Sequence, residues 1–413
     1  MARNKFRGDA PAVAQVQEFQ ITGAGTAGDE VTVPISNKSV VAVVPATPTA
    51  TTVADAVAAA LGASEEPEFK EVVWTTDGVD VVIGTSETPG RPFVIGTIAV
   101  TGTVTVGAVS ITTASKGPNH WDDANNWSLG AVPVSTNDVD LQDCAVDIRY
   151  GLAQSGVTLA SFNIHSTYTG RIGLTPQEGT YFQYRATELA ISATTITIGA
   201  GDGSGSPMIR LNTGSVQTAL NVMGTSTAGL QGQPALWWRG THASNTMTVT
   251  RGAVGVAYSY GDVATLTTLF VGSRGGSADA LVYTGVGLTL ATLTQTSGTL
   301  AFEGTCTTIT LDGGTLTATG PSIAVTTLTA RGGTFNFDGL GTITTAQFGT
   351  GALLDLSRDP RTGKTFTNIT LYAKSGIKDP NKSGTFTNGL VLKCEIDEVQ
   401  PHDLGDLLTL TRS

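Results

Sequence analysis

A short glycine motif that recurs between residues 289 and 356 decides the fold. Its copies are Ser297-Gly298-Thr299-Leu300, Gly313-Gly314-Thr315-Leu316, Gly332-Gly333-Thr334-Phe335 and Thr350-Gly351-Ala352-Leu353. The second residue moves from 298 to 314, 333 and 351, in steps of 16, 19 and 18 residues. Short Thr-rich apolar segments separate the copies. A loose period of roughly 20 residues with glycine corners is typical of stacked β-coils, in which each coil pairs its backbone with its neighbours.

The composition favours the same architecture over the whole chain. Its 413 residues exceed the roughly 250–300 at which a single core stops growing. Charged residues make up only 14%, and the chain has 51 glycines, which are common at corners. We therefore predict a mainly β protein, with a small N-terminal α+β domain followed by a parallel, right-handed β-helix (solenoid). An array of β-sandwiches is the structural alternative, and it would need longer strands and fewer Gly-Gly corners.

Changes in composition and pattern predict four segments. Residues 1–10 are expected to form a flexible arm, and residues 11–107 a small α+β docking domain. Residues 119–356 are expected to form the solenoid. Residues 357–413 are richer in Lys, Asp and Pro, and we expect them to cap the open last coil.

One helix is predicted inside the docking domain. Its apolar face has helical spacing and consists of Val53, Ala56, Val57, Ala60 and Leu61. Thr52 occupies the expected N-cap position and Gly62 the expected stop. Asp77-Gly78 is a typical hairpin turn between two strands that follow this helix.

Charge and hydropathy make several classes of function unfavourable. The formal net charge of −11 suits nucleic-acid backbones poorly, because binding them requires Lys and Arg. No apolar run of about 18 residues is present, so no membrane span is predicted. The basic N-terminus lacks the apolar core of a secretory signal, and we therefore expect the chain to fold in a host cytoplasm.

Motifs that carry chemistry are weak, and we predict no catalytic, cofactor-binding or metal-binding residue. The three cysteines are far apart, and the four histidines lack metal-ligand spacing. Gly23–Gly28 matches a dinucleotide-binding pattern, but a strand follows it where a helix is needed, so we interpret it as a loop. Asp138 and Asp140 share a strand face and could serve calcium binding or glycoside cleavage, although acidic residues on a solvent-facing coil are commoner.

Trp237 and Trp238 are the candidate surface residues. Neighbouring side chains on a strand face opposite ways, so at least one of the two is expected outside a solenoid core. An exposed Trp can stack on a sugar or anchor a protein interface. A role in the core or in closing a loop is the alternative.

Three stretches together resemble structural proteins of tailed-bacteriophage virions and their prophage relatives. They are Pro11–Val16 with the Gly28–Val33 segment, the helix with Glu68–Val72, and a Trp-rich segment around residues 121–133. The Trp-rich segment also resembles the opening motif of β-helical bacterial surface proteins. That resemblance implies that four residues cover the first coil: Trp121, Asn126, Trp127 and Pro133.

The resemblance implies a structural, non-enzymatic virion component, either a capsid decoration (cement) protein or a tail or fibre protein. Such a protein acts through contacts with itself, with a homotrimer favoured, and with major capsid or tail proteins. The alternative is a carbohydrate-binding or carbohydrate-degrading β-helix, tailspike-like or secreted. It would need a groove with paired carboxylates or calcium near an exposed aromatic residue. A bacterial surface adhesin is a third possibility and would require an export signal.

Overall fold

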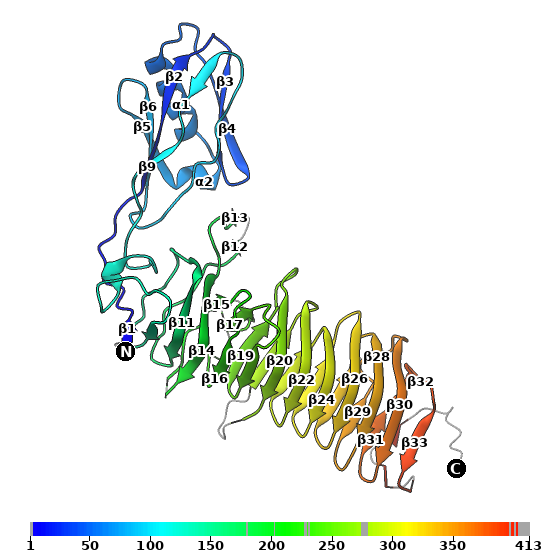
Figure 1. The fold of residues 1–413 in the computed structure, drawn as a ribbon. Helices are drawn as coiled ribbons and strands as arrows, with labels where there is room; N and C mark the ends of the chain where they lie inside the picture. Colours follow the sequence, from blue (N-terminus) through cyan, green and yellow to red (C-terminus); the bar gives the residue numbers. More distant parts are fainter. Residues whose placement is uncertain are drawn as a thin grey trace.

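The computed structural model describes residues 3–178, 181–201, 203–226, 229, 232–273, 280–395, 398–399 and 402–403. It consists of a small α+β domain at one end of a long stack of strands (Figure 1). No helix within these ranges is long and apolar enough to cross a membrane.

The stack is a parallel β-helix. Among the described residues, 24 strands join into one sheet that runs from β1 (Arg3–Lys5) through β10 (Asp138–Leu141) to β34 (His402–Asp403). Strands mostly pair with the strand two positions further along the chain, as β22 (Leu288–Gln295) does with β24 (Thr305–Leu311). These pairings are parallel, which confirms the predicted solenoid and is incompatible with a β-sandwich array.

The recurring glycine motif forms a corner and one rung of an interior ladder. Leu300 of β23 (Thr299–Phe302) pairs with Leu316, and Leu316 pairs with Phe335. Leu354, and not Leu353, continues the ladder, so the fourth copy of the motif is offset by one residue. The second residue of every copy is a glycine with φ between +75° and +80°, a conformation that other residues avoid.

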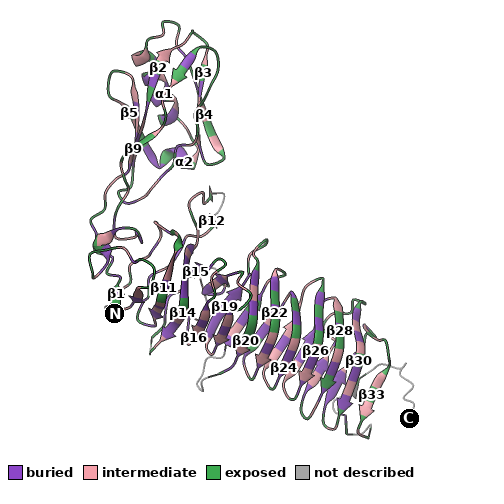
Figure 2. Cartoon of the chain, viewed as in Figure 1, coloured by how far each residue is buried: buried purple, intermediate pink, exposed green. Residues whose placement is uncertain are grey.

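A second interior ladder runs along the longer strands. Leu293, Ile309, Leu328, Ala346 and Ile369 pair in successive coils and are all buried. Their strands are β22, β24, β26 (Ile323–Ala330), β28 (Gly341–Phe348) and β30 (Lys364–Tyr372). Figure 2 shows the resulting alternation of buried and exposed residues along each strand. Burying one Leu or Ile side chain contributes about 1.5–3 kcal/mol, so the ladders supply much of the solenoid's stability.

The small domain has two antiparallel sheets around one helix. The first contains β5 (Val72–Thr76), β6 (Val81–Ser86), β2 (Val16–Ala24), β8 (Val104–Val106) and β9 (Ser110–Thr113). The second contains β4 (Lys38–Val43), β3 (Glu30–Ile35) and β7 (Ala99–Val100). The helices are α1 (Ala50–Gly62) and the short α2 (Pro67–Lys70). Because β9 pairs with β2, the domain extends beyond the expected boundary at residue 107.

Helix α1 corresponds to the predicted helix but begins earlier. Its N-cap is Thr49, whose hydroxyl accepts a hydrogen bond from the Thr52 N–H at 3.1 Å. Thr52 returns the bond, because its own hydroxyl accepts from the Thr49 N–H at 2.9 Å. Thr52 is therefore the third residue of the helix (N3), where it completes a capping box with Thr49, and it is not the N-cap expected from the sequence.

The expectation of a flexible N-terminal arm is wrong for the described residues 3–10. Arg3 and Lys5 of β1 pair with Asp138 and Asp140 of β10, so β1 is the first rung of the solenoid. Phe6 is buried, and its ring packs against an aromatic core residue, Trp127, at 5.3 Å between centroids. The physical reason is that the first coil would otherwise expose apolar core residues at its open end, which Phe6 helps to cover.

The small domain is consequently an insertion within the solenoid. The chain leaves the first coil, forms the domain and returns beside its point of departure. There, the Val13 N–H donates to the Lys116 carbonyl at 2.9 Å and the Lys116 N–H donates to the Val13 carbonyl at 3.4 Å.

The coils also continue past residue 356, so the expected cap over 357–413 is wrong for most of its described part. The later strands are β30, β31 (Gly376–Lys378), β32 (Gly384–Phe386), β33 (Leu390–Lys393) and β34. Among the residues that suggested a cap, Asp359, Pro360, Asp379 and Pro380 lie in the turns between these strands, whereas Lys364, Lys378 and Lys393 lie in the strands themselves. Residues 404–413 lie outside the described residues.

Candidate functional site

An outward-facing row of stacked side chains crosses four coils of the solenoid. Arg210 of β15 (Ile209–Asn212) pairs with Trp237 of β17 (Leu236–Arg239). Trp237 pairs with Gly255 of β19 (Gly252–Val256), which pairs with Tyr283 of β21 (Ala280–Thr284). Tyr258, from the turn after β19, fills the place above Gly255. We call Arg210, Trp237, Tyr258 and Tyr283 the outer row.

The members of the outer row contact one another in sequence. The guanidinium carbon of Arg210 lies 3.7 Å from the centroid of the Trp237 ring, a cation–π arrangement. The ring centroids of Trp237 and Tyr258 lie 4.9 Å apart, and those of Tyr258 and Tyr283 lie 6.1 Å apart, both with T-shaped geometry. Tyr258 and Tyr283 are 36% and 37% exposed, so the row presents aromatic surface to solvent.

The two adjacent tryptophans face opposite ways, as expected for neighbours on a strand. Trp238 is 2% exposed and belongs to the core cluster of the solenoid. Trp237 is partly exposed and belongs to the outer row. The structure therefore places Trp237 at the surface and Trp238 in the core.

A cavity of about 230 Å³ lies beside the outer row. Arg239 stands between two carboxylates in its lining. Its Nε donates to both oxygens of Glu188, at 2.8 and 3.0 Å, and its Nη1 lies 3.8 Å from Asp262 Oδ1. The other oxygen of Asp262 accepts from the Ser259 N–H at 3.1 Å, which fixes the turn.

Arg210 is the second guanidinium in the cavity lining. It is only 6% exposed, and its Nε has no hydrogen-bond partner among the described residues. Burial lowers the pKa of Arg210 to about 10, although the nearby carboxylates of Glu188 and Asp262 oppose that shift. With Arg239, the lining carries two cations and two anions, so its formal charges balance.

The Trp residues predicted to cover the first coil are buried there. The rings of Trp121 and Trp127 meet edge to face at 4.7 Å between centroids, and Trp127 Nε1 donates to the Trp121 carbonyl at 2.7 Å. Trp121 also packs edge to face on Phe162 of β11 (Ala153–His165), at 5.7 Å. Both tryptophans belong to the core cluster of the solenoid and pack at its N-terminal end, and Pro133 is buried as well.

Asn126 connects the N-terminal segment to this cover. Its Oδ1 accepts the Ala10 N–H at 2.9 Å, and its Nδ2 donates to the Gly117 and His120 carbonyls at 2.8 and 2.7 Å. Ala10 and Phe6 were not predicted members of the cover, because sequence reasoning has no local signal for partners more than a hundred residues away.

The acidic residues of β10 connect adjacent coils through side-chain hydrogen bonds. Asp138 accepts a hydrogen bond from the Ser161 hydroxyl at 2.6 Å, and Asp140 accepts from Asn163 Nδ2 at 2.9 Å. Arg3 lies 3.3 Å from Asp140 on the opposite side. Within the described ranges, no group of three or more His, Cys, Asp and Glu side chains could hold a metal ion.

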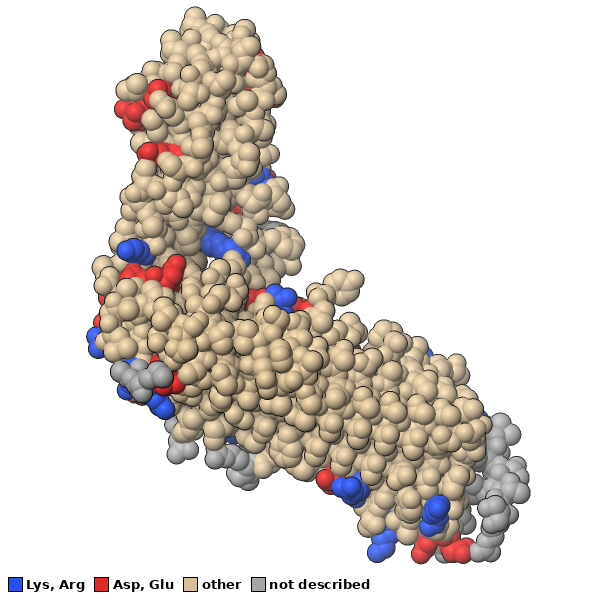
Figure 3. Space-filling model, viewed as in Figure 1, with Lys and Arg blue, Asp and Glu red and all other residues tan. Residues whose placement is uncertain are grey.

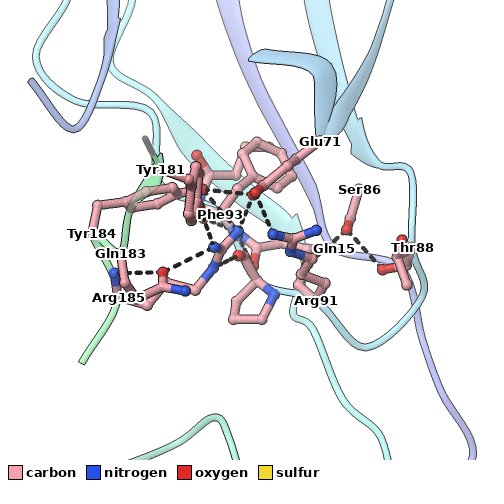
Figure 4. Close-up of polar contacts among 12 residues, drawn as sticks. Gln15, Glu71, Ser86, Thr88, Arg91, Phe93, Tyr181, Gln183, Tyr184 and Arg185 are labelled. Atoms are coloured by element: carbon pink, nitrogen blue, oxygen red, sulfur yellow. Dashed lines mark hydrogen bonds and ion pairs between the residues drawn. The ribbon is translucent and has the colours of Figure 1, made fainter. Parts of the chain in front are cut away.

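A buried polar cluster joins the small domain to the solenoid (Figure 4). At its centre, Glu71 is 9% exposed and forms ion pairs with Arg91 of its own domain and Arg185 of the solenoid. Tyr184 donates its hydroxyl to Glu71 at 3.3 Å, and burial raises the pKa of Tyr184 well above its usual range. We call these four residues the junction cluster. Glu71 lies in the Glu68–Val72 stretch, but no sequence pattern indicated that the four residues come together.

The fold and these surfaces define a class of protein: a parallel β-helix that carries an inserted α+β domain. No protein-family model, curated protein or solved structure matches the chain.

Proposed function

We propose that the chain is a structural, non-enzymatic component of a tailed-phage or prophage virion, either a capsid decoration protein or a tail protein. The observation that carries the proposal is the insertion of the small domain between the first rung, β1, and the rest of the solenoid. A domain attached at both ends, and held by a buried ion cluster, suits an anchor that transmits load.

The junction explains how such an anchor would work. The chain crosses between the two parts twice, near Val13 and Lys116, and these two crossings are hydrogen bonded to each other. The ion pair between Glu71 and Arg185 adds a third attachment from a later coil. Force on the small domain would therefore spread over several coils, and the parallel ladders would carry it along the stack.

The surface of the solenoid supports contacts between subunits. On the face shown in Figure 3, charged side chains gather near the junction and toward the C-terminal end, whereas the middle is largely uncharged. Exposed apolar side chains in the turns after β19 and β21 include Val263 and Val286. Protein interfaces are depleted of charge at their centres, so this middle region suits packing against another copy. A homotrimer, bound to major capsid or tail proteins, fits the threefold and sixfold positions of virions.

The insertion makes a direct experiment possible. An ideal Cβ on Gly117 would lie 3.2 Å from the Cα of Ala12, so the two ends of the insertion almost touch. Residues 13–116 can therefore be replaced by two glycines while the rest of the chain is kept. Particles purified from cells that carry either gene are then analysed by quantitative peptide mass spectrometry.

We expect many copies of the full chain per particle and almost none of the excised variant. Circular dichroism checks that the variant keeps its β signal. Full-length protein that is absent from purified particles would contradict the proposal.

A further inference from the structure

The cavity beside the outer row contains polar groups whose hydrogen-bonding capacity is only partly used within the protein. Arg210 is almost fully buried and lines the cavity, yet its Nε has no partner among the described residues. A buried donor without a partner is unfavourable unless something else satisfies it. Carboxylates accept as many as four hydrogen bonds, and protein groups use only part of the capacity of Asp262.

The balance of charge restricts the chemistry of a ligand. Two guanidinium groups, of Arg210 and Arg239, face two carboxylates, of Glu188 and Asp262. An anionic ligand would be attracted by the arginines but repelled by the carboxylates. A cationic ligand would be attracted by the carboxylates but repelled by the arginines. A neutral ligand with many hydroxyl groups can accept from the arginines and donate to the carboxylates at once.

The aromatic part of the row provides the complementary apolar surface. Trp237 lines the cavity, and Tyr258 and Tyr283 continue from it along the direction in which the coils stack. Partly exposed rings with a fixed orientation can pack on the C–H face of a sugar ring, whose edge carries hydroxyls. A pyranose has both features, and a glycan chain could follow the two tyrosines from one coil to the next.

We propose that this cavity is a binding subsite for a neutral pyranose residue of a glycan, which hydrogen bonds to Arg210 and Asp262 and packs against the aromatic rings of the outer row. The site binds without cleaving, and it adds a recognition surface to the structural role. Both can coexist, because the subsite lies on the outside of the solenoid and the small domain lies at its end (Figure 1).

Saturation-transfer NMR on the full-length protein tests the proposal. The probes are maltohexaose, cellohexaose, laminarihexaose and mannohexaose, with hexagalacturonate as the acidic comparison. We expect transfer to ring protons of at least one neutral probe and less to hexagalacturonate. Trp237→Ala and Arg210→Lys should each weaken binding roughly tenfold, which corresponds to about 1.4 kcal/mol. Tyr372→Ala is the matched control, because Tyr372 is a similarly exposed tyrosine in a distant coil.

Several results would overturn the proposal. They are no transfer to any neutral probe, a preference for hexagalacturonate, or equal losses in the Tyr372→Ala control. Circular dichroism and light scattering accompany each variant. If Trp237→Ala lowers the oligomeric mass while sugar binding is unchanged, the row is a contact between subunits and the glycan proposal fails.

Discussion

Arg210 and Trp237 are partners in adjacent coils, and the guanidinium carbon of one lies 3.7 Å from the ring centroid of the other. This contact exists only because the coils stack in one register, since a shift of either strand by one residue would turn that strand's side chain into the core. The outer row is therefore a product of the same ladders that form the interior.

Replacing Gly255 tests the packing of the outer row. An added Cβ would lie 2.8 Å from the Cβ of Tyr258, a distance that forces one of the two residues to move. We expect Gly255→Val to displace Tyr258 and to lower the free energy of unfolding by about 1–3 kcal/mol, measured by urea denaturation.

Gly156→Ala is the control for this substitution, because Gly156 also lies in a strand and a Cβ there would meet nothing within 4 Å. It should leave stability nearly unchanged. Equal effects of the two substitutions would show that Tyr258 does not depend on the space above Gly255.

The interior ladder predicts a large effect at Leu328. Its side chain is buried between Ile309 and Ala346 of the adjacent coils. We expect Leu328→Ala to destabilise the protein by about 2–5 kcal/mol, because it leaves a cavity in a closely packed stack. Thr326→Ala on the exposed face of the same strand should change stability by less than about 0.5 kcal/mol. A small effect at Leu328 in thermal or urea unfolding would contradict the ladder.

The junction cluster predicts a change of shape at Glu71. Glu71→Gln removes the charge that Arg91 and Arg185 share, and breaking a buried ion pair costs about 3–5 kcal/mol. We expect the junction to open while both parts stay folded, so small-angle X-ray scattering should show a wider distribution of maximum dimensions. Glu65→Gln removes an exposed ion pair with Lys70 and should leave the scattering curve unchanged. An unchanged curve for both variants would mean that the junction does not depend on Glu71.

Cys306 predicts a dependence of stability on alkaline pH. Burial raises the pKa of its thiol from 9.0 to about 12, and Sγ lies 3.2 Å from the Thr308 carbonyl oxygen. Between these values the folded protein keeps a proton that the unfolded chain loses, so stability is present below pH 9 and falls as pH rises toward 12. Relative to Cys306→Ala, wild-type stability should fall by up to about 1.4 kcal/mol per pH unit above 9. Parallel pH profiles for the two proteins would contradict this prediction.

Local patterns predicted the features that depend on neighbours in sequence. The glycine motif indicated corners and rungs, because positive φ and alternating burial are properties of a few consecutive residues. Helix α1 was found from its apolar spacing, although its N-cap is Thr49 and not the expected Thr52. The opposite orientation of Trp237 and Trp238 followed from strand geometry alone.

Features that depend on distant partners were not predicted. Arg3–Lys5 looks like a polar arm until β10 is placed beside it, and the sequence contains no local sign of that pairing. Glu71 meets Arg185, 114 residues away, only after β10 and β11 have stacked on β1 and the chain has returned toward the small domain. Tyr258 joins the outer row because Gly255 leaves room for it, which requires the register of three strands.

The most direct test of a structural role through subunit contacts is the mass of the purified full-length protein in solution, measured by light scattering over a wide range of concentrations. One chain has a mass of 42.3 kDa. The proposal predicts a stable mass three times that of the chain, unchanged on dilution. A single-chain mass at every concentration would contradict assembly through contacts between copies.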